Sequence, residues 1–277
     1  MNQESITSLQ NPRIKQLVAL RESRQRKKAG LTRVDGGREL LRALEAGLRP
    51  EAVFVREGLR PAGELAEAME RCRGLDIEAQ PITSAVYDKV RYGDRDEGVC
   101  ATVAWQPGKL DSLDVTPDSF WLVVEGVEKP GNLGALLRTA DAAGVHAVIL
   151  ADPACDPANP NVIRASMGTL FSQAVVRATT AETLKFLTEH HTGIGITRPQ
   201  ARRPWYEASL SGRVAIVSGA EDRGLDPAWR DAASEDVALP MAGFADSLNL
   251  AAATAILLYE AVRQRRSGQA PPGSTVK

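Results

Sequence analysis

The chain has 277 residues, of which 43% are hydrophobic and 25% are charged, and its formal net charge is −1. That length suits two domains, and the hydrophobic content is sufficient to fill their cores. No stretch approaches the roughly 18 apolar residues of a membrane span, and the first residues contain no apolar signal segment. We therefore expect a cytoplasmic protein without a membrane partner.

The three cysteines, Cys72, Cys100 and Cys155, are far apart in the sequence and form no C-x-x-C pair. This spacing predicts neither a disulfide framework nor a zinc ribbon. We expect free thiols and no metal site.

Positive charge is concentrated near the amino terminus, although the whole chain is almost neutral. Residues 1–36 contain eight lysines and arginines against three acidic residues, and the segment 21–28 is RESRQRKK. Such a segment can bind phosphates, but a run of charge is also typical of a solvated helix face. The candidate nucleic-acid contacts here are Arg13, Lys15, Arg24, Arg26, Lys27 and Lys28.

Residues 1–105 show apolar positions at helical spacing between short apolar runs, which predicts a small α/β domain. We expect helices at 14–20, 36–48, 62–74 and 83–91, and strands at 51–55, 75–80 and 99–105. Residues 106–119 contain two prolines, three aspartates and little periodicity, so they are the expected linker.

Residues 120–266 alternate apolar strands with helices, which predicts a parallel sheet covered on both faces. We expect strands at 120–126, 145–151, 173–176, 193–197, 214–219 and 237–240, and helices after 130, near 161–166, at 181–190, near 227–234 and at 247–265. Residues 267–277 are polar and rich in Pro, Gly and Ser, and they are the expected disordered tail.

Ligands bind parallel sheets beyond the carboxyl ends of the strands, which selects the loops 126–134, 219–225 and 240–249. The glycines of the first loop, at 126, 131 and 134, match neither the dinucleotide fingerprint nor the Walker loop. Asn132 can cap the helix that follows, and Arg138 lies in that helix among apolar neighbours. The alternative is that Arg138 extends to a surface carboxylate.

The other two loops carry related side chains. VSGAEDRGL turns at Gly219 and contains Glu221, while the third loop places Ser247 and Asn249 at the head of an apolar helix. Ser247 is the expected cap of that helix, and both residues could serve as caps alone. Three such loops at one edge of a sheet indicate a binding site.

Together the loops resemble a known family. GVEKPGNLGALLRTADAAG, GAEDRGL and LPMAGFADSLNLAAATAILLYE are similar in order and spacing to the three motifs of the SpoU-type (TrmH-like) 2'-O-ribose RNA methyltransferases of the SPOUT superfamily. Residues 1–105 look like the small RNA-binding domain, similar to certain ribosomal proteins, of members that act on 23S ribosomal RNA. The resemblance thus covers nearly the whole chain.

The resemblance implies a carboxy-terminal parallel-sheet α/β domain with a deep trefoil knot. It also implies a homodimer, S-adenosyl-L-methionine as methyl donor and a ribose 2'-hydroxyl of RNA, with 23S ribosomal RNA favoured, as acceptor. The cofactor positions carried over are Gly219, Leu239, Leu248, Ser218, Met241 and Ser247. The positions associated with catalysis are Asn132, Arg138, Glu221, Ser247 and Asn249. Lys129 and Arg164 join the expected RNA contacts, the latter in NVIRASMGTLFSQAVV, which resembles the segment after the first motif.

The resemblance leaves the role of Arg138 open between two functions. A ribose hydroxyl is a poor nucleophile, so the enzyme must orient it and manage one proton. Family proposals make this arginine the base, but an arginine stays protonated in nearly any protein setting. We therefore prefer a clamp on the phosphate of the target nucleotide.

Two positions depart from the common pattern of the family. Lys129 stands where many members have an acidic residue, which makes the loop more basic. The third motif continues Leu250-Ala251-Ala252, where many members have valine and a hydroxyl or small residue, so one hydrogen bond near the cofactor is in question.

Three alternatives stay open. The acceptor can be a transfer RNA, or the protein can be a catalytically silent RNA-binding or ribosome-assembly protein on the same fold. The third alternative is a nicotinamide or nucleotide enzyme of doubly wound type. Such an enzyme would need G-x-G-x-x-G and an acidic residue about 20 residues later, and the first loop lacks that glycine spacing.

Overall fold

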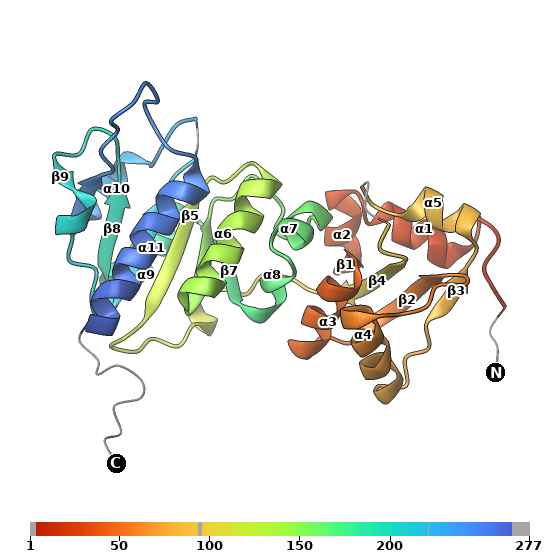
Figure 1. The fold of residues 1–277 in the computed structure, drawn as a ribbon. Helices are drawn as coiled ribbons and strands as arrows, with labels where there is room; N and C mark the ends of the chain where they lie inside the picture. Colours follow the sequence, from red (N-terminus) through yellow and green to blue (C-terminus); the bar gives the residue numbers. More distant parts are fainter. Residues whose placement is uncertain (1–3, 94–95, 221, 268–277) are drawn as a thin grey trace, which may run out of the picture. The chain divides into compact units, whose positions relative to one another are not determined.

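The computed structural model describes residues 4–93, 96–220 and 222–267, and it divides into two compact units (Figure 1). The first unit contains Met1–Gln106 together with Asp156–Ser172, and the second contains Pro107–Cys155 together with Gln173–Lys277. The sequence pattern alone places the segment 156–172 in the second block. The borders expected at 105, 119 and 266 stay predictions, and the expected tail, except Ser267, lies outside the described residues.

The first unit is built on a four-stranded sheet with the order β1-β4-β2-β3. Strand β4 runs antiparallel to β1 and to β2, whereas β2 and β3 are parallel. The strands are β1 (Leu31–Asp35), β2 (Pro50–Arg56), β3 (Gln80–Ile82) and β4 (Val99–Ala104). The helices are α1 (Pro12–Ala19), α2 (Ser23–Ala29), α3 (Gly37–Glu45), α4 (Gly63–Gly74) and α5 (Ser84–Val90).

The core of the first unit joins α1 and α5 to the sheet. Apolar residues one helical turn apart, such as Ile14 and Leu17, point from the helices to the strands. The buried cluster consists of Ile14, Leu17, Phe54, Ile82, Val86, Tyr87, Val90 and Cys100. The helices expected at 14–20 and 83–91 supply five of these eight residues.

Strand β1 is an element that the sequence pattern did not indicate. Its residues, LTRVD, include a basic and an acidic side chain, and yet all five are buried. The guanidinium of Arg33 donates to the carboxylate of Asp35 and to the carbonyl of Val90, the latter at 2.9 Å. Because these charges have partners, the strand can be buried without an isolated ion.

The segment 156–172 carries α7 (Pro160–Ala165) and α8 (Thr169–Ser172) and packs within the first unit. Asp156 accepts hydrogen bonds from the guanidinium of Arg26 at 2.6 and 3.0 Å. The hydroxyl of Thr32 donates to the carbonyl of Ala158 at 2.6 Å. These contacts explain why the segment groups with the first unit, which no local pattern reveals.

The second unit contains a seven-stranded sheet with the order β7-β6-β5-β10-β8-β11-β9. Every adjacent pair is parallel, as the alternating pattern predicts. The strands are β5 (Phe120–Glu125), β6 (Ala147–Ala151), β7 (Ala174–Ala178), β8 (Gly193–Thr197), β9 (Arg203–Pro204), β10 (Val214–Ser218) and β11 (Glu235–Ala238).

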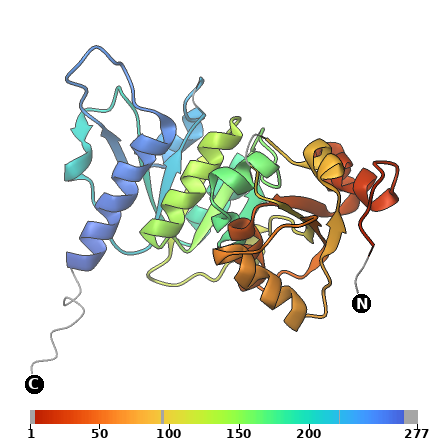
Figure 2. The ribbon, with the colours of Figure 1, turned by 45° about the vertical axis from the view of Figure 1, so that its right-hand side comes forward.

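Helices cover both faces of this sheet. Helices α6 (Pro130–Ala143) and α11 (Leu250–Ser267) lie side by side on one face (Figures 1 and 2). Helices α9 (Thr180–Glu189) and α10 (Pro227–Ala232) place Leu187 and Trp229 in a buried cluster on the other face, with Trp121 and Val123 of β5. No helix in the described part of the chain is long and apolar enough to cross a membrane.

Candidate functional site

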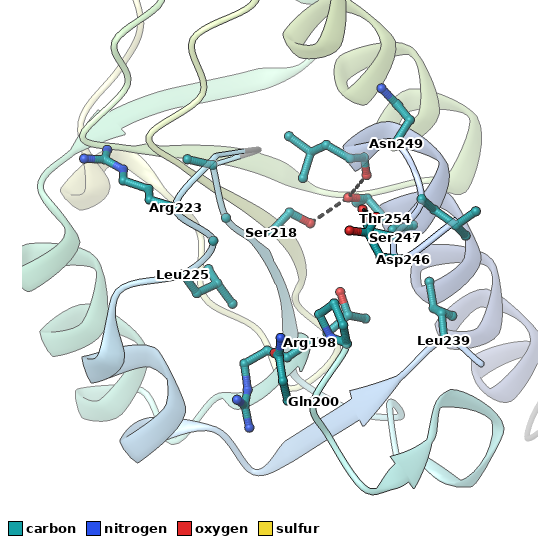
Figure 3. Close-up of a pocket in the computed structure, with 18 of the residues that line it drawn as sticks. Arg198, Gln200, Ser218, Arg223, Leu225, Leu239, Asp246, Ser247, Asn249 and Thr254 are labelled. Carbon is teal, nitrogen blue, oxygen red and sulfur yellow. Dashed lines mark hydrogen bonds between the residues drawn. The ribbon is translucent and has the colours of Figure 1, made fainter. Parts of the chain in front are cut away.

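A cavity of about 720 Å³ opens at the carboxyl ends of β8, β10 and β11 (Figure 3). This is the edge where parallel sheets bind ligands. Its lining is formed by residues 197–200, 218–220, 222–225, 230, 239, 241, 246–250, 253 and 254. All six positions that the resemblance assigns to the cofactor are in this lining.

A buried pair of hydroxyls joins the end of β10 to α11. Oγ of Ser218 lies 2.7 Å from Oγ1 of Thr254, which in turn donates to the carbonyl of Leu250 at 2.7 Å (Figure 3). A hydroxyl has one proton to donate, so Ser218 is the donor to Thr254. The oxygen of Ser218 thus keeps its capacity to accept a further hydrogen bond at the cavity wall.

The loop after β10 is a tight turn that only glycine permits at its first position. Ala220 and Gly224 exchange backbone hydrogen bonds of 3.2 and 3.0 Å. A Cβ on Gly219 would lie 2.5 Å from the carbonyl carbon of Gly224, so any side chain there would displace the backbone. Glu221, a predicted catalytic residue in this turn, lies outside the described residues.

Glu125, at the end of β5, is bonded to the residue that follows this loop and was not among the residues expected at the site. Its buried carboxylate accepts hydrogen bonds from the backbone N–H of Asp226 and from the hydroxyl of Thr180, both at 2.9 Å. The signal was available, because an acidic residue ends the otherwise apolar strand FWLVVE. A buried carboxylate needs such partners, and here they fix the end of the loop.

The loop of the third motif ends at Asn249, which reaches the first motif. Nδ2 of Asn249 donates to Oδ1 of Asn132 at 3.3 Å, and Oδ1 of Asn249 accepts from the backbone N–H of Ala251 at 2.9 Å. Asn249 is therefore the cap of α11. The expectation that Ser247 caps this helix is wrong, because Ser247 is exposed and donates to Asp246 at 3.3 Å.

The first motif also begins its helix earlier than expected. Helix α6 starts at Pro130, with Lys129 as its cap residue, so Asn132 lies inside the first turn and does not cap it. Proline favours the first position of a helix because its fixed φ suits it and no N–H is lost. Asn132 is thereby left to bond with Asn249.

Arg138 lies on the exposed side of α6, whereas Leu133, Leu136 and Leu137 are buried. It does not line the cavity, and the described part of the chain contains no hydrogen bond or ion pair of its guanidinium. The sequence led us to expect a side chain turned to the site. In the single chain it is exposed instead.

The basic residues expected to contact RNA fall into two groups. Those with exposed side chains are Arg13, Lys15, Arg24, Lys27, Lys28 and Lys129. Arg26 is 3% exposed and donates to Asp156 and to the carbonyls of Leu20 and Arg21. Arg164 is half-buried and donates to the carbonyl of Tyr92 at 2.8 Å. The guanidinium of Arg26 is therefore not free for a phosphate.

Comparison with known proteins identifies the family to which these motifs belong. The model of the SpoU rRNA Methylase family matches residues 119–259, more than half of the chain. The chain belongs to this family. The model of the MRM3-like substrate binding domain matches residues 11–101. The resemblance drawn from the three loops is thus confirmed.

The family includes curated enzymes to which this chain is similar. The 23S rRNA (guanosine-2'-O-)-methyltransferase RlmB of Escherichia coli strain K12 is 34% identical over 225 residues, which cover 78% of this chain and 91% of the relative. RlmB of Photorhabdus laumondii is 37% identical over 223 residues, which cover 78% and 90%.

Solved structures of SpoU enzymes share the fold. A crystal structure of an RNA 2'-O ribose methyltransferase is 39% identical, with a TM-score of 0.83, and the match covers 94% of this chain and 99% of that chain. The SpoU methyltransferase AviRb from Streptomyces viridochromogenes, in complex with the cofactor AdoMet, is 30% identical with a TM-score of 0.82, covering 93% and 100%. The predicted α/β class with a parallel sheet is confirmed, and the trefoil knot stays a prediction.

Several cavity residues of this SpoU protein were not predicted. Thr254 had a local signal, because it is the one polar residue in the run LAAATAILL. Arg198 had none, because its partner Asp236 lies 38 residues later, on β11. The hydrogen bond to Asp236 raises the pKa of Arg198, which therefore stays charged.

The described residues contain no cluster of three or more metal-ligating side chains.

Proposed function

We propose that this chain transfers a methyl group from S-adenosyl-L-methionine to a ribose 2'-hydroxyl of 23S ribosomal RNA. The observation that carries the proposal is that the second and third predicted motif loops line one cavity in a SpoU family chain, while Asn132 of the first loop is bonded to Asn249 of the cavity lining. The relatives support the same activity, since RlmB is a 23S rRNA (guanosine-2'-O-)-methyltransferase and AviRb was solved with AdoMet.

The chemistry of the cavity fits this cofactor. Leu225, Leu239, Met241 and Leu248 offer apolar surface to a purine ring. Charged side chains of both signs, including Asp222, Asp246, Arg223 and Arg230, suit a ligand that carries an ammonium and a carboxylate. Bound there, the cofactor supplies a methyl group on a sulfonium centre. We assign its binding to Gly219, Leu239 and Leu248, with Ser218, Met241 and Ser247 beside them.

The two asparagines are the groups we assign to the orientation of the ribose. Asn249 lines the cavity and is bonded to Asn132, so both amides are held at the junction of the first and third motifs. Amides can donate to and accept from a hydroxyl without a change of charge. Ser247 and Glu221 complete the proposed set.

Arg138 is assigned to the phosphate of the target nucleotide. Its exposure, and the absence of an ion-pair partner in the described chain, support its availability to an external anion. Its charge is permanent, which suits a clamp that polarises the hydroxyl more than it suits a base. The proton then leaves through the phosphate or water.

The first unit is the proposed RNA-binding domain. Its exposed basic residues Arg13, Lys15, Arg24, Lys27 and Lys28 can neutralise phosphates, and Lys129 of the second unit adds a positive charge at the first motif. Arg164 contributes one edge of its guanidinium, because the other is bonded to Tyr92. Arg26 is not among the proposed RNA contacts, because its guanidinium is bonded to Asp156. The trefoil knot, the homodimer and the cytoplasmic location belong to the same proposal.

The test is to map 2'-O-methyl groups across ribosomal RNA in cells with and without the gene. We expect one site to be lost on deletion, to return with the wild type and to stay absent with Arg138→Ala. Titration calorimetry with S-adenosyl-L-methionine separates the alternatives: no binding would point to a silent RNA-binding protein. A site lost from transfer RNA and not from ribosomal RNA would overturn the proposed acceptor.

A further inference from the structure

Phe244 is a fully exposed aromatic residue in the loop between β11 and α11. A single apolar residue on a surface needs no explanation. Here, however, the same loop also exposes Met241 and Leu248, so three of the large apolar side chains exposed by the described residues belong to eight consecutive positions. This clustering indicates a contact surface.

The three exposed side chains of this loop differ in their relation to the cavity. Met241 and Leu248 line the cavity, whereas Phe244 does not. The loop stands out beyond the ends of the strands and is the blue loop that leads into α11 in Figures 1 and 2. Its far end is held by the two hydrogen bonds of Asn249. Phe244 lies in the sequence between Met241 and Asp246, which both line the cavity, and its own side chain is fully exposed outside that lining.

The charge of the loop decides what kind of contact the ring can make with RNA. Between Leu239 and Asn249 there is no lysine or arginine, and the one charged residue is Asp246. An acidic loop does not attract phosphates. An aromatic ring can still bind the face of a base, because every base has a π-face and stacking needs no charge. The arginines of the cavity lining, such as Arg223 and Arg230, lie on other segments.

We propose that Phe244 stacks on an unpaired base of the RNA, at or beside the methylated nucleotide, and holds its ribose at the mouth of the cavity. The inference rests on the proposed function. Unpaired bases in loops and bulges are the part of an RNA that proteins read by stacking on aromatic side chains. The ring therefore selects an unpaired target.

The test compares three substitutions at this position. Phe244→Ala and Phe244→Leu remove the aromatic face, and Phe244→Trp keeps it. We expect kcat/KM for a 23S ribosomal RNA transcript to fall about 5- to 100-fold for the first two, and to stay near the wild-type value for the third. Tyr206→Ala removes another exposed ring of the same unit that does not line the cavity, and it should leave kcat/KM unchanged.

A direct signal comes from 2-aminopurine placed beside the target nucleotide of the transcript. Its fluorescence should change when the wild type binds and should not change with Phe244→Ala. An unchanged kcat/KM for Phe244→Ala would overturn the proposal. A loss of affinity for S-adenosyl-L-methionine would overturn it too, because the ring would then cover the cofactor. A different mass of Phe244→Ala in light scattering would show that the ring contacts a second copy of the chain, and it would overturn the proposal as well.

Failure of the proposed function gives a different result. If the wild type neither binds S-adenosyl-L-methionine nor methylates RNA, that function is wrong. The fluorescence change on RNA binding, and its loss in Phe244→Ala, then still decide whether the ring stacks on a base.

Discussion

Asn249, the residue before α11, donates from Nδ2 to Oδ1 of Asn132 in α6, 3.3 Å away and 117 residues earlier in the chain. The same side chain caps α11, because its Oδ1 accepts from the N–H of Ala251. One amide therefore joins two motifs and starts a helix. Its two functions can be separated by substitution.

Asn249→Asp keeps the cap and removes the donor to Asn132. We expect its thermal stability to stay near that of the wild type while methyl transfer falls. Asn249→Ala removes both hydrogen bonds and should in addition lower the free energy of unfolding by about 0.5–2 kcal/mol. Thermal denaturation and methyl-transfer rates check these outcomes. In a double-mutant cycle with Asn132→Ala, additive losses of activity would show that the contact has no role.

Glu125 is expected to position the loop 219–225, which follows β10, through its hydrogen bond to the N–H of Asp226. Glu125→Ala leaves that N–H without its acceptor and should lower the free energy of unfolding by about 1–3 kcal/mol. It should also lower the affinity for S-adenosyl-L-methionine. Glu125→Gln should restore much of it, since the amide oxygen still accepts from Asp226 and the amide nitrogen can donate to Thr180. Titration calorimetry measures the affinity of both variants for S-adenosyl-L-methionine. Glu128→Ala, which removes an exposed carboxylate three residues later, is the control. Equal affinities for all variants would contradict the positioning role.

Arg26 and Lys27 are adjacent, and we expect their replacement to change different properties: the stability of the fold for Arg26 and the binding of RNA for Lys27. Arg26→Ala removes the cation from the largely buried Asp156, which keeps the hydrogen bonds donated by Ser23 and by the N–H of Ala158, and it should lower the free energy of unfolding by about 1–3 kcal/mol. Lys27→Ala should leave stability unchanged and reduce the slope of log K for RNA against log salt by about 1. Urea unfolding and RNA binding at several salt concentrations separate the two. A folded Arg26→Ala protein with a reduced salt slope would return Arg26 to the RNA contacts.

Tyr87 should make stability depend on alkaline pH. Its buried hydroxyl accepts from the N–H of Gly98 at 2.7 Å, and burial raises the pKa of Tyr87 from 10.0 to about 12. The neutral form is thus favoured by folding, so this stabilisation is complete below pH 10 and is lost as the pH rises towards 12.

Tyr87→Phe tests that dependence. At neutral pH it should lower the free energy of unfolding by about 1–3 kcal/mol, because the N–H of Gly98 loses its acceptor. The difference from the wild type should narrow above pH 10, where the wild type loses its advantage. Urea unfolding at neutral and alkaline pH measures it. A difference that stays constant with pH would mean that Tyr87 does not titrate as stated.

Local patterns in the sequence predicted the second unit and its cavity well. Apolar runs such as FWLVV locate buried parallel strands, and a glycine directly after a strand, as at Gly219, marks a turn at the ligand edge. The exposure of Arg138 also had a local signal. It follows Leu137 by one residue, which places it about 100° around the helix from that buried side chain.

Contacts between distant residues account for what the sequence did not predict. Arg26 looks like a phosphate ligand within RESRQRKK, and its partner Asp156 lies 130 residues away. Strand β1 is rich in polar residues, and it is buried because Arg33 bonds to the carbonyl of Val90, 57 residues later, as well as to Asp35. The helix caps were misplaced by two residues or more, because the competing candidates Ser247 and Asn249 have similar propensities.

The membership of Asp156–Ser172 in the first unit constrains the order in which the protein can fold during its synthesis. The amino-terminal unit is incomplete until the ribosome has added Ser172, when β5, α6 and β6 of the second unit have already been synthesised. Until then Arg26 has no carboxylate, and Thr32 has no carbonyl from Ala158. Folding in which the first unit is finished before the second begins, the usual route for two domains, is therefore closed to this chain.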